Sequence, residues 1–103
     1  MGEEFCWEKL SPSLFICVSS AHKFGTDAFL LSDFAAPRRK DLCCDLGTGC
    51  GIIPLLWFRD DPPRLCYGAD IQKQAIEQLE QSIQKNGLKD RFIPCLLYTS
   101  PSP

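Results

Sequence analysis

The 103-residue chain predicts a doubly wound α/β fold, in which helices pack on a mostly parallel sheet. Short apolar runs alternate with longer segments of helical periodicity, a glycine-rich turn follows one apolar run, and an aspartate ends the next. Hydrophobic residues make up 45% of the chain and charged residues 23%, which is typical of a globular domain rather than of a disordered segment. The length allows one domain.

The first elements are expected before the glycine-rich turn. Residues 15–18 (FICV) follow a Ser-Pro turn and predict a short strand of an N-terminal hairpin or extension, within residues 1–19. Residues 28–35 (AFLLSDFA) predict a helix whose start is capped by Thr26 or Asp27 and which ends before Pro37. Residues 41–46 (DLCCDL) are typical of a strand buried on both faces in a parallel sheet.

The second half continues the alternation. Residues 52–59 (IIPLLWFR) are apolar nearly all round and predict a buried helix, whose first turn tolerates Pro54 because that N–H needs no partner. Residues 64–69 (RLCYGA) predict a second strand, closed by Asp70. A helix should follow, because apolar residues at positions 75, 76, 79 and 83 form one stripe, and Gly87 is expected to end it. Residues 91–95 begin a third strand.

The turn Asp45–Gly51 reads D-x-G-x-G-x-G and carries the candidate chemistry. Gly47 and Gly49 let the backbone bend sharply and approach a ligand without a Cβ, while Gly51 allows the next helix to pack closely. Thr48 lies in the same turn and is counted among the candidate binding residues. Asp70 follows Gly51 by nineteen residues at the end of the next strand, where its carboxylate can accept hydrogen bonds from both hydroxyls of a ribose.

The glycine spacing favours a nucleoside cofactor without phosphate. A dinucleotide-binding turn usually reads G-x-G-x-x-G and rests a pyrophosphate on the helix N-terminus, but here the third glycine comes one residue earlier. Asp45 can serve the cationic amino-acid end of S-adenosylmethionine directly or through water. A nicotinamide-dependent oxidoreductase is the weaker alternative. Two local alternatives stay open: Asp70 caps the next helix, and Ile71 belongs to the core instead of lining the adenine.

Three segments carry a family resemblance: FGTDAFLLSDFA (24–35), DLGTGCGIIPLL (45–56) and GADIQKQAIEQLEQSIQKNGLKDRF (68–92). Together they resemble the bacterial tRNA adenine-N6 methyltransferases that modify valine tRNA next to the anticodon. The resemblance covers roughly residues 20–93 and implies the Rossmann-like sheet of class I methyltransferases, with this chain holding the N-terminal half and about three of its seven strands. It implies S-adenosylmethionine-dependent methylation of adenine N6 in tRNA. A protein-glutamine N-methyltransferase and a non-catalytic S-adenosylmethionine-binding fragment are the alternatives.

The resemblance also implies roles for particular residues. The glycine turn and the second strand would bind S-adenosylmethionine, and the segment before the first helix would close over its methionine end; these residues are Asp45, Gly47, Gly49, Gly51 and Asp70, then Phe24, Gly25, Thr26 and Asp27. Such enzymes hold the target amine with an N-P-P-[YF] motif, which this sequence lacks; the nearest text, DPPR (61–64), is expected to be a loop. No catalytic residue is therefore assigned, and the chain alone is expected to be inactive. The cofactor-binding half is placed at residues 20–95, and residues 96–103 are expected to be a non-native tail.

Composition limits the partners. The formal net charge is −2 and the one basic cluster is residues 38–40, so most tRNA contacts are expected outside this chain. Seven cysteines, an odd number without a C-x-x-C pair, and a single histidine, His22, suggest neither a disulfide framework nor a metal site. Reduced thiols and the lack of a long apolar stretch favour a cytoplasmic protein without membrane contact.

Overall fold

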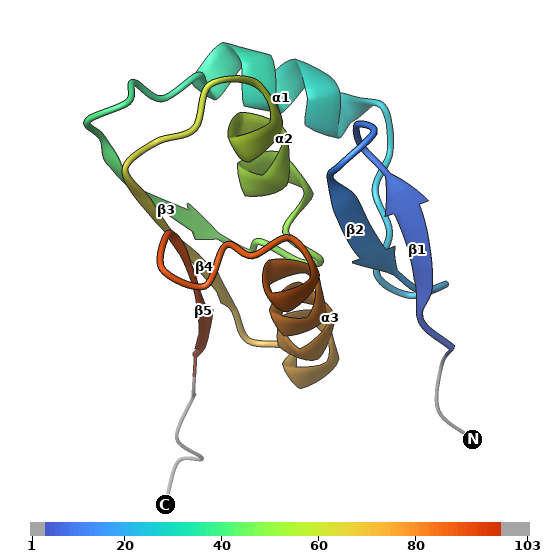
Figure 1. Ribbon diagram of the computed structural model, residues 1–103. Helices are drawn as coiled ribbons and strands as arrows, with labels where there is room; N and C mark the ends of the chain where they lie inside the picture. The colour runs from blue at the N-terminus through green and yellow to red at the C-terminus, as the bar shows by residue number, and fades with distance from the viewer. Residues whose placement is uncertain (1–3, 98–103) are drawn as a thin grey trace, which may run out of the picture.

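The computed structural model describes residues 4–97, which form two sheets and three helices (Figure 1). In chain order the elements are β1 (Cys6–Lys9), β2 (Phe15–Val18), α1 (Asp27–Ala35), β3 (Leu42–Leu46), α2 (Ile52–Asp60), β4 (Leu65–Asp70), α3 (Lys73–Lys85) and β5 (Phe92–Leu96). Among these described residues no helix is both long enough and apolar enough to cross a membrane.

The larger sheet has the order β3-β4-β5, and both strand pairs are parallel. Its strands alternate with α2 and α3, so the α/β alternation expected from the sequence is confirmed. β5 extends to Leu96, and the N–H of Leu97 donates to the carbonyl of Asp70 at 2.9 Å. β5 thus ends one residue beyond Cys95, and the expected non-native tail of residues 96–103 stays a prediction, with residues 98–103 outside the described part.

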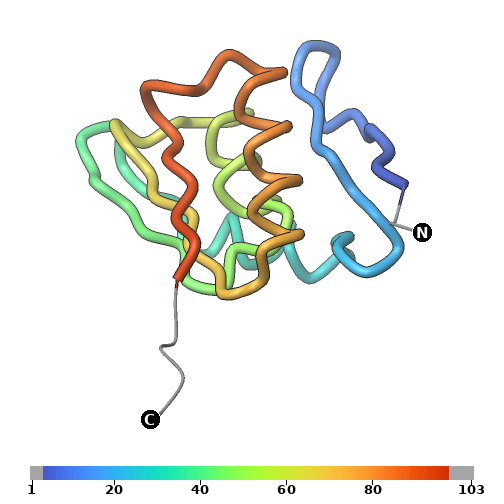
Figure 2. Tube along the Cα trace, turned by 90° about the horizontal axis from the view of Figure 1, so that it is seen from below, coloured from blue at the N-terminus to red at the C-terminus, as the bar shows by residue number. Residues whose placement is uncertain are grey.

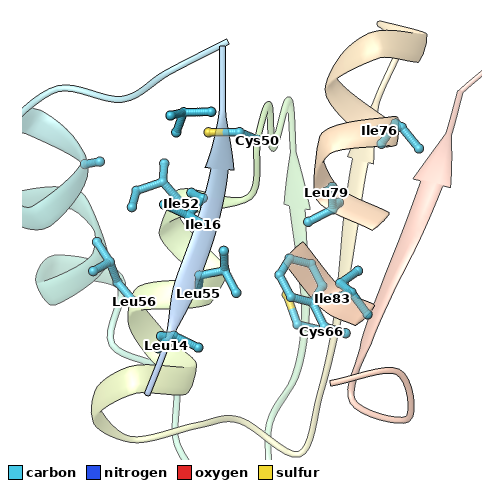
Figure 3. Packing of buried hydrophobic residues seen from close by; sticks show 13 residues of the cluster. Leu14, Ile16, Cys50, Ile52, Leu55, Leu56, Cys66, Ile76, Leu79 and Ile83 are labelled. Carbon is cyan, nitrogen blue, oxygen red and sulfur yellow. The ribbon is translucent and has the colours of Figure 1, made fainter. Parts of the chain in front are cut away.

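The core lies where α2 and α3 meet the sheet and the N-terminal hairpin. Leu55 and Leu56 of α2, Leu79 of α3 and Phe92 of β5 are fully buried. Ile16 of β2 is also fully buried and enters the same cluster (Figure 3). Of the two alternatives for residues 15–18, the hairpin is present as β1 and β2, and β2 contributes to the core that supports the glycine turn.

One face of the parallel sheet is open. Leu42, Leu46 and Tyr67 are 67%, 74% and 42% exposed, and the strand register places their side chains on the same face. The expectation that residues 41–46 would be buried on both faces is therefore wrong for the described residues. The apolar run correctly predicted the strand, but no helix of residues 4–97 covers its second face.

A polar joint attaches the hairpin to α3. The N–H of Phe15 donates to the side-chain oxygen of Asn86 at 2.9 Å, and the Asn86 amide donates back to the Phe15 carbonyl at 2.6 Å. The N–H of Cys17 donates to the Ser82 hydroxyl at 2.8 Å, and the Gln78 amide donates to the Cys17 carbonyl at 3.2 Å. The side chains of Gln78, Ser82 and Asn86, each one helical turn apart, thus hydrogen-bond the backbone edge of β2 that a third strand would otherwise pair with. α3 accordingly runs alongside the hairpin (Figure 2).

The start of α1 differs from expectation. Thr26 is the N-cap residue, but its side chain makes no capping hydrogen bond, and Asp27 is already the first helical residue. Backbone bonds form this end instead: the N–H of Ala28 donates to the Gly25 carbonyl and that of Phe29 to the Thr26 carbonyl, each at 3.2 Å. The predicted side-chain cap is therefore wrong, although the helix itself is confirmed.

Candidate cofactor-binding site

The candidate site lies at the carboxyl ends of β3 and β4, which are neighbours in the sheet. The N–H groups of Gly47 and Thr48 both donate to the carbonyl of Ala69, at 2.8 and 3.0 Å. The N–H of Gly49 donates to Asp70 Oδ2 at 2.9 Å. The structure therefore brings the glycine turn and the aspartate of the next strand into contact, as the sequence predicted. Ala69 was not predicted, because it acts through its backbone and no side-chain pattern marks it.

The glycines of the turn face two different environments. Gly47 and Gly49 have φ values of +71° and +58°, and no atom lies within 4 Å of the position that a Cβ would occupy. A ligand could approach the backbone at both residues. Gly51, with φ of +89°, is enclosed: a Cβ there would overlap Leu79 and lie 3.4 Å from the ring of Phe92. Gly51 therefore has a packing role, but its neighbours are α3 and β5, whereas the strand before the turn was the expected neighbour.

The backbone donors of the turn point into the protein. Gly47, Thr48 and Gly49 donate to the end of β4 as described, and the N–H of Gly51 donates to the Thr48 carbonyl at 2.9 Å. Pro54, in the first turn of α2, has no N–H to offer. A pyrophosphate is normally cradled by free N–H groups at this position. These four N–H groups are therefore not free to bind a phosphate, which agrees with the spacing argument against a dinucleotide.

Two carboxylates give the site its charge. Asp70 is 8% exposed, and Asp45 is half-buried on the preceding strand. Burial raises the pKa of Asp45, the negative charge of Asp70 raises it further, and the nearby Thr48 hydroxyl offsets part of this rise. Within residues 4–97 neither aspartate has a Lys or Arg ion-pair partner. A cationic ligand group would therefore be stabilised here.

Thr48 and Ile71 complete the turn's surroundings. Thr48 is 4% exposed, and its hydroxyl forms no hydrogen bond of standard geometry with the described residues. Ile71 is 66% exposed directly after Asp70, so the alternative that it belongs to the core is wrong. An exposed apolar side chain beside the turn is suited to contact with a flat apolar ring.

Asp70 also stabilises the turn before α3. Its Oδ1 accepts the N–H of Gln72 at 2.9 Å, and Gln72 is the N-cap residue of that helix. The capping alternative is therefore correct in part: Asp70 supports the start of α3 from two residues before the N-cap, while its other oxygen holds Gly49.

The segment before α1 makes local contacts. Phe24 packs against the core and meets the ring of Phe29 edge-on, with ring centroids 6.0 Å apart. Gly25 and Thr26 supply the backbone carbonyls at the start of the helix, and Asp27 is its first residue. Closure of these residues over the methionine end of a cofactor stays a prediction.

The basic cluster is tied to aspartates. The guanidinium of Arg39 lies 3.2 Å from Asp61, and the backbone N–H of Arg38 donates to Asp41 at 2.7 Å. Arg38, Arg39 and Asp61 lie beside a cavity of about 540 Å³ between the end of α1 and α2, with Trp57 on its wall. Acidic neighbours lower the local positive potential, which favours a surface loop over a phosphate site.

Comparison with solved structures shows which fold the chain has. No protein-family model matches the chain, and no curated protein sequence matches it. Among solved structures, Methanocaldococcus jannaschii TYW2 in complex with AdoMet is 19% identical, with a TM-score of 0.72 over 93% of this chain and 44% of that one. The M. jannaschii tRNA m1G37 methyltransferase is 20% identical, with a TM-score of 0.70 over 90% of this chain and 30% of that one.

The same fold occurs in a protein described by another reaction. Precorrin 8W decarboxylase from Methanobacterium thermoautotrophicum is 23% identical, with a TM-score of 0.62 over 77% of this chain and 43% of that one. The chain thus spans less than half the length of each of these structures. Its three parallel strands and helices match part of the Rossmann-like fold found in class I methyltransferases.

Proposed function

We propose that this chain is the S-adenosylmethionine-binding portion of an N-methyltransferase that acts on the N6 amine of adenine in tRNA. The observation that carries the proposal is the contact between Gly49 and Asp70, 2.9 Å from nitrogen to oxygen, which places an open glycine turn beside a buried carboxylate. Because the glycines of the turn have no Cβ, an adenosyl group can bind close to their backbone, and the carboxylate can accept hydrogen bonds from the ribose hydroxyls.

The residues present fit each part of the cofactor. Asp70 would accept from the ribose hydroxyls, Ile71 would lie along the adenine, and Asp45 would serve the cationic amino-acid end directly or through water. The inward-facing N–H groups of the turn suit a ligand without phosphate. When bound, the cofactor would supply a methyl group that passes from its sulfonium to an acceptor nitrogen by in-line displacement, with S-adenosylhomocysteine as the leaving group and loss of a proton from the nitrogen; positioning accounts for most of the catalysis in such a step.

tRNA is the proposed acceptor for two reasons. The FGTDAFLL segment (24–31) narrows the sequence resemblance to tRNA adenine-N6 methyltransferases, and one structural neighbour is a tRNA m1G37 methyltransferase. No residue of this chain is assigned to the acceptor base, which would have to be exposed or flipped to reach the methyl group. A protein-glutamine acceptor is the alternative.

Calorimetric titration with S-adenosylhomocysteine tests the cofactor. We expect binding by the wild-type chain, at least tenfold weaker binding by Asp45→Asn, and unchanged binding by Asp33→Asn, an exposed aspartate on α1 with the same change in charge. NADH should not compete. Absence of heat with the folded wild-type chain, or displacement by NADH, would refute the proposed cofactor.

Methyl transfer by the complete gene product tests the acceptor. Tritium from labelled S-adenosylmethionine should appear in N6-methyladenine of unmodified valine tRNA and not in a glutamine-containing protein acceptor. Label in the protein alone would establish the alternative.

A further inference from the structure

The Asp70 carboxylate joins two backbone segments. Its Oδ2 accepts the N–H of Gly49 in the turn after β3, and its Oδ1 accepts the N–H of Gln72 in the turn before α3, both at 2.9 Å. The residue is 8% exposed, and both hydrogen bonds are partly buried. Hydrogen bonds to an ionised acceptor are stronger than those between neutral groups, particularly when they are shielded.

Gly47 and Gly49 have no side chain to fix their part of the turn, although Thr48 between them is 4% exposed and packs beside Gly68. Space is open beside Gly47 and Gly49, which both have a positive φ. Because a glycine has no Cβ, its backbone can also adopt many other conformations. Three consecutive N–H groups hold the turn on β4: those of Gly47 and Thr48 on the Ala69 carbonyl, and that of Gly49 on Asp70. Asp70 supplies the only side chain among these described acceptors.

We propose that Asp70 is a positioning residue, which holds Gly49 and thus keeps the turn in its ligand-accepting conformation before any cofactor arrives. This rests on the proposed function and adds a role to ribose binding. Each carboxylate oxygen can accept two hydrogen bonds, so one N–H on each oxygen leaves capacity for a ribose hydroxyl. The carboxylate can therefore hold the turn and the ribose at once, and its removal should weaken binding even of a ligand that has no ribose hydroxyls.

Amide hydrogen exchange of the chain without ligand tests the first part. In Asp70→Ala we expect exchange at Gly49 to accelerate at least tenfold, while the Cys66 amide, bonded to the Arg91 carbonyl at 2.8 Å in the sheet, keeps its protection. Asp90→Asn, an exposed aspartate in a loop, should change neither. Unchanged exchange at Gly49 would overturn the proposal, as would equal acceleration at Gly49 and Cys66, because that indicates general unfolding. Asp70→Asn provides a milder variant that retains one acceptor oxygen.

Ligand binding separates positioning from ribose contact. We expect Asp70→Ala to weaken binding of S-adenosylhomocysteine and, at least threefold, binding of its 2′,3′-dideoxy analogue. A loss that disappears with the analogue would show that Asp70 acts through the ribose alone and would overturn the proposal. If the folded wild-type chain binds neither ligand, the proposed function fails, and the exchange rates still decide whether Asp70 positions the turn.

Discussion

Replacement of Gln78 by leucine should destabilise the chain strongly, although the two side chains are similar in size. Gln78 is fully buried in α3. Its amide donates to the carbonyls of Cys17 and His22 at 3.2 and 3.1 Å, and its oxygen accepts the hydroxyl of Ser19 at 2.7 Å. The change therefore removes three hydrogen bonds and substitutes an apolar group that cannot satisfy these partners.

The size of the effect follows from what each partner retains. The His22 carbonyl still accepts the N–H of Ser19 at 3.0 Å, and the Ser19 hydroxyl still accepts the N–H of His22 at 3.2 Å. The Cys17 carbonyl faces α3 and loses its described donor, which costs about 1–3 kcal/mol for a buried group. With about 0.5–1.5 kcal/mol for each of the other bonds, partly offset by the apolar leucine, we expect a loss of roughly 2–4 kcal/mol.

Urea unfolding followed by circular dichroism measures this loss. A domain of this size has a total stability of about 5–15 kcal/mol, so the shift in midpoint should be large. Gln81→Leu is the matched control, because Gln81 lies on the same helix but is exposed, and its effect should stay within about 0.5 kcal/mol. If the two variants unfold at the same urea concentration, the polar joint between α3 and β2 does not contribute as described.

Three further predictions concern the turn and the open sheet face. Gly51→Ala should lower the free energy of unfolding by about 1–3 kcal/mol, because the new Cβ would overlap Leu79 and the residue has a positive φ. Gly25→Ala is the control, because a Cβ there meets open space, and an equal decrease in melting temperature for the two variants would contradict the prediction. The raised pKa of Asp45 means that its stabilising neutral form is lost as pH rises through the folded-state pKa. Asp45→Asn should therefore be more stable than the wild type at pH 7, with a smaller advantage toward pH 4, and a pH-independent difference would count against this. We expect the chain to self-associate through its open sheet face, because Leu46 is 74% exposed beside an edge of β3 that is unpaired within residues 4–97. Leu46→Lys should therefore reduce light scattering, and undiminished scattering would argue against this face as the cause.

Local patterns predicted most of the elements. The apolar runs around Cys43 and Cys66 became β3 and β4, the stripe through Leu79 became the inner face of α3, and Gly87 follows its end with φ of +66°. The meeting of the glycine turn with Asp70 was also predictable, because carboxyl ends of neighbouring parallel strands share one edge of the sheet. A hairpin was offered for residues 15–18, but its partner strand β1 was not located, since a four-residue strand with every side chain exposed has no apolar alternation to reveal it.

Burial of polar residues was beyond the reach of the sequence pattern. Gln78 and Ser82 are fully buried, yet in the sequence they are indistinguishable from the exposed Gln81 and Gln84. Their burial depends on β2, which lies about sixty residues away and offers backbone groups that need partners. Only the tertiary arrangement decides which polar positions of an amphipathic helix face another element.

α3 links the N-terminal hairpin to the candidate site. Gln78 bonds the end of β2, and the next residue, Leu79, fills the space beside Gly51 that a side chain would otherwise occupy. A shift of α3 that separated Gln78 from β2 would therefore also move Leu79 against the glycine turn, because a helix moves largely as a rigid unit. Cofactor affinity should then fall in Gln78→Leu although Gln78 lies outside the site, and the fall should exceed that in Gln81→Leu. Equal affinities in a chain that remains folded would show that the turn is held by its bonds to β4 alone and does not depend on the position of α3.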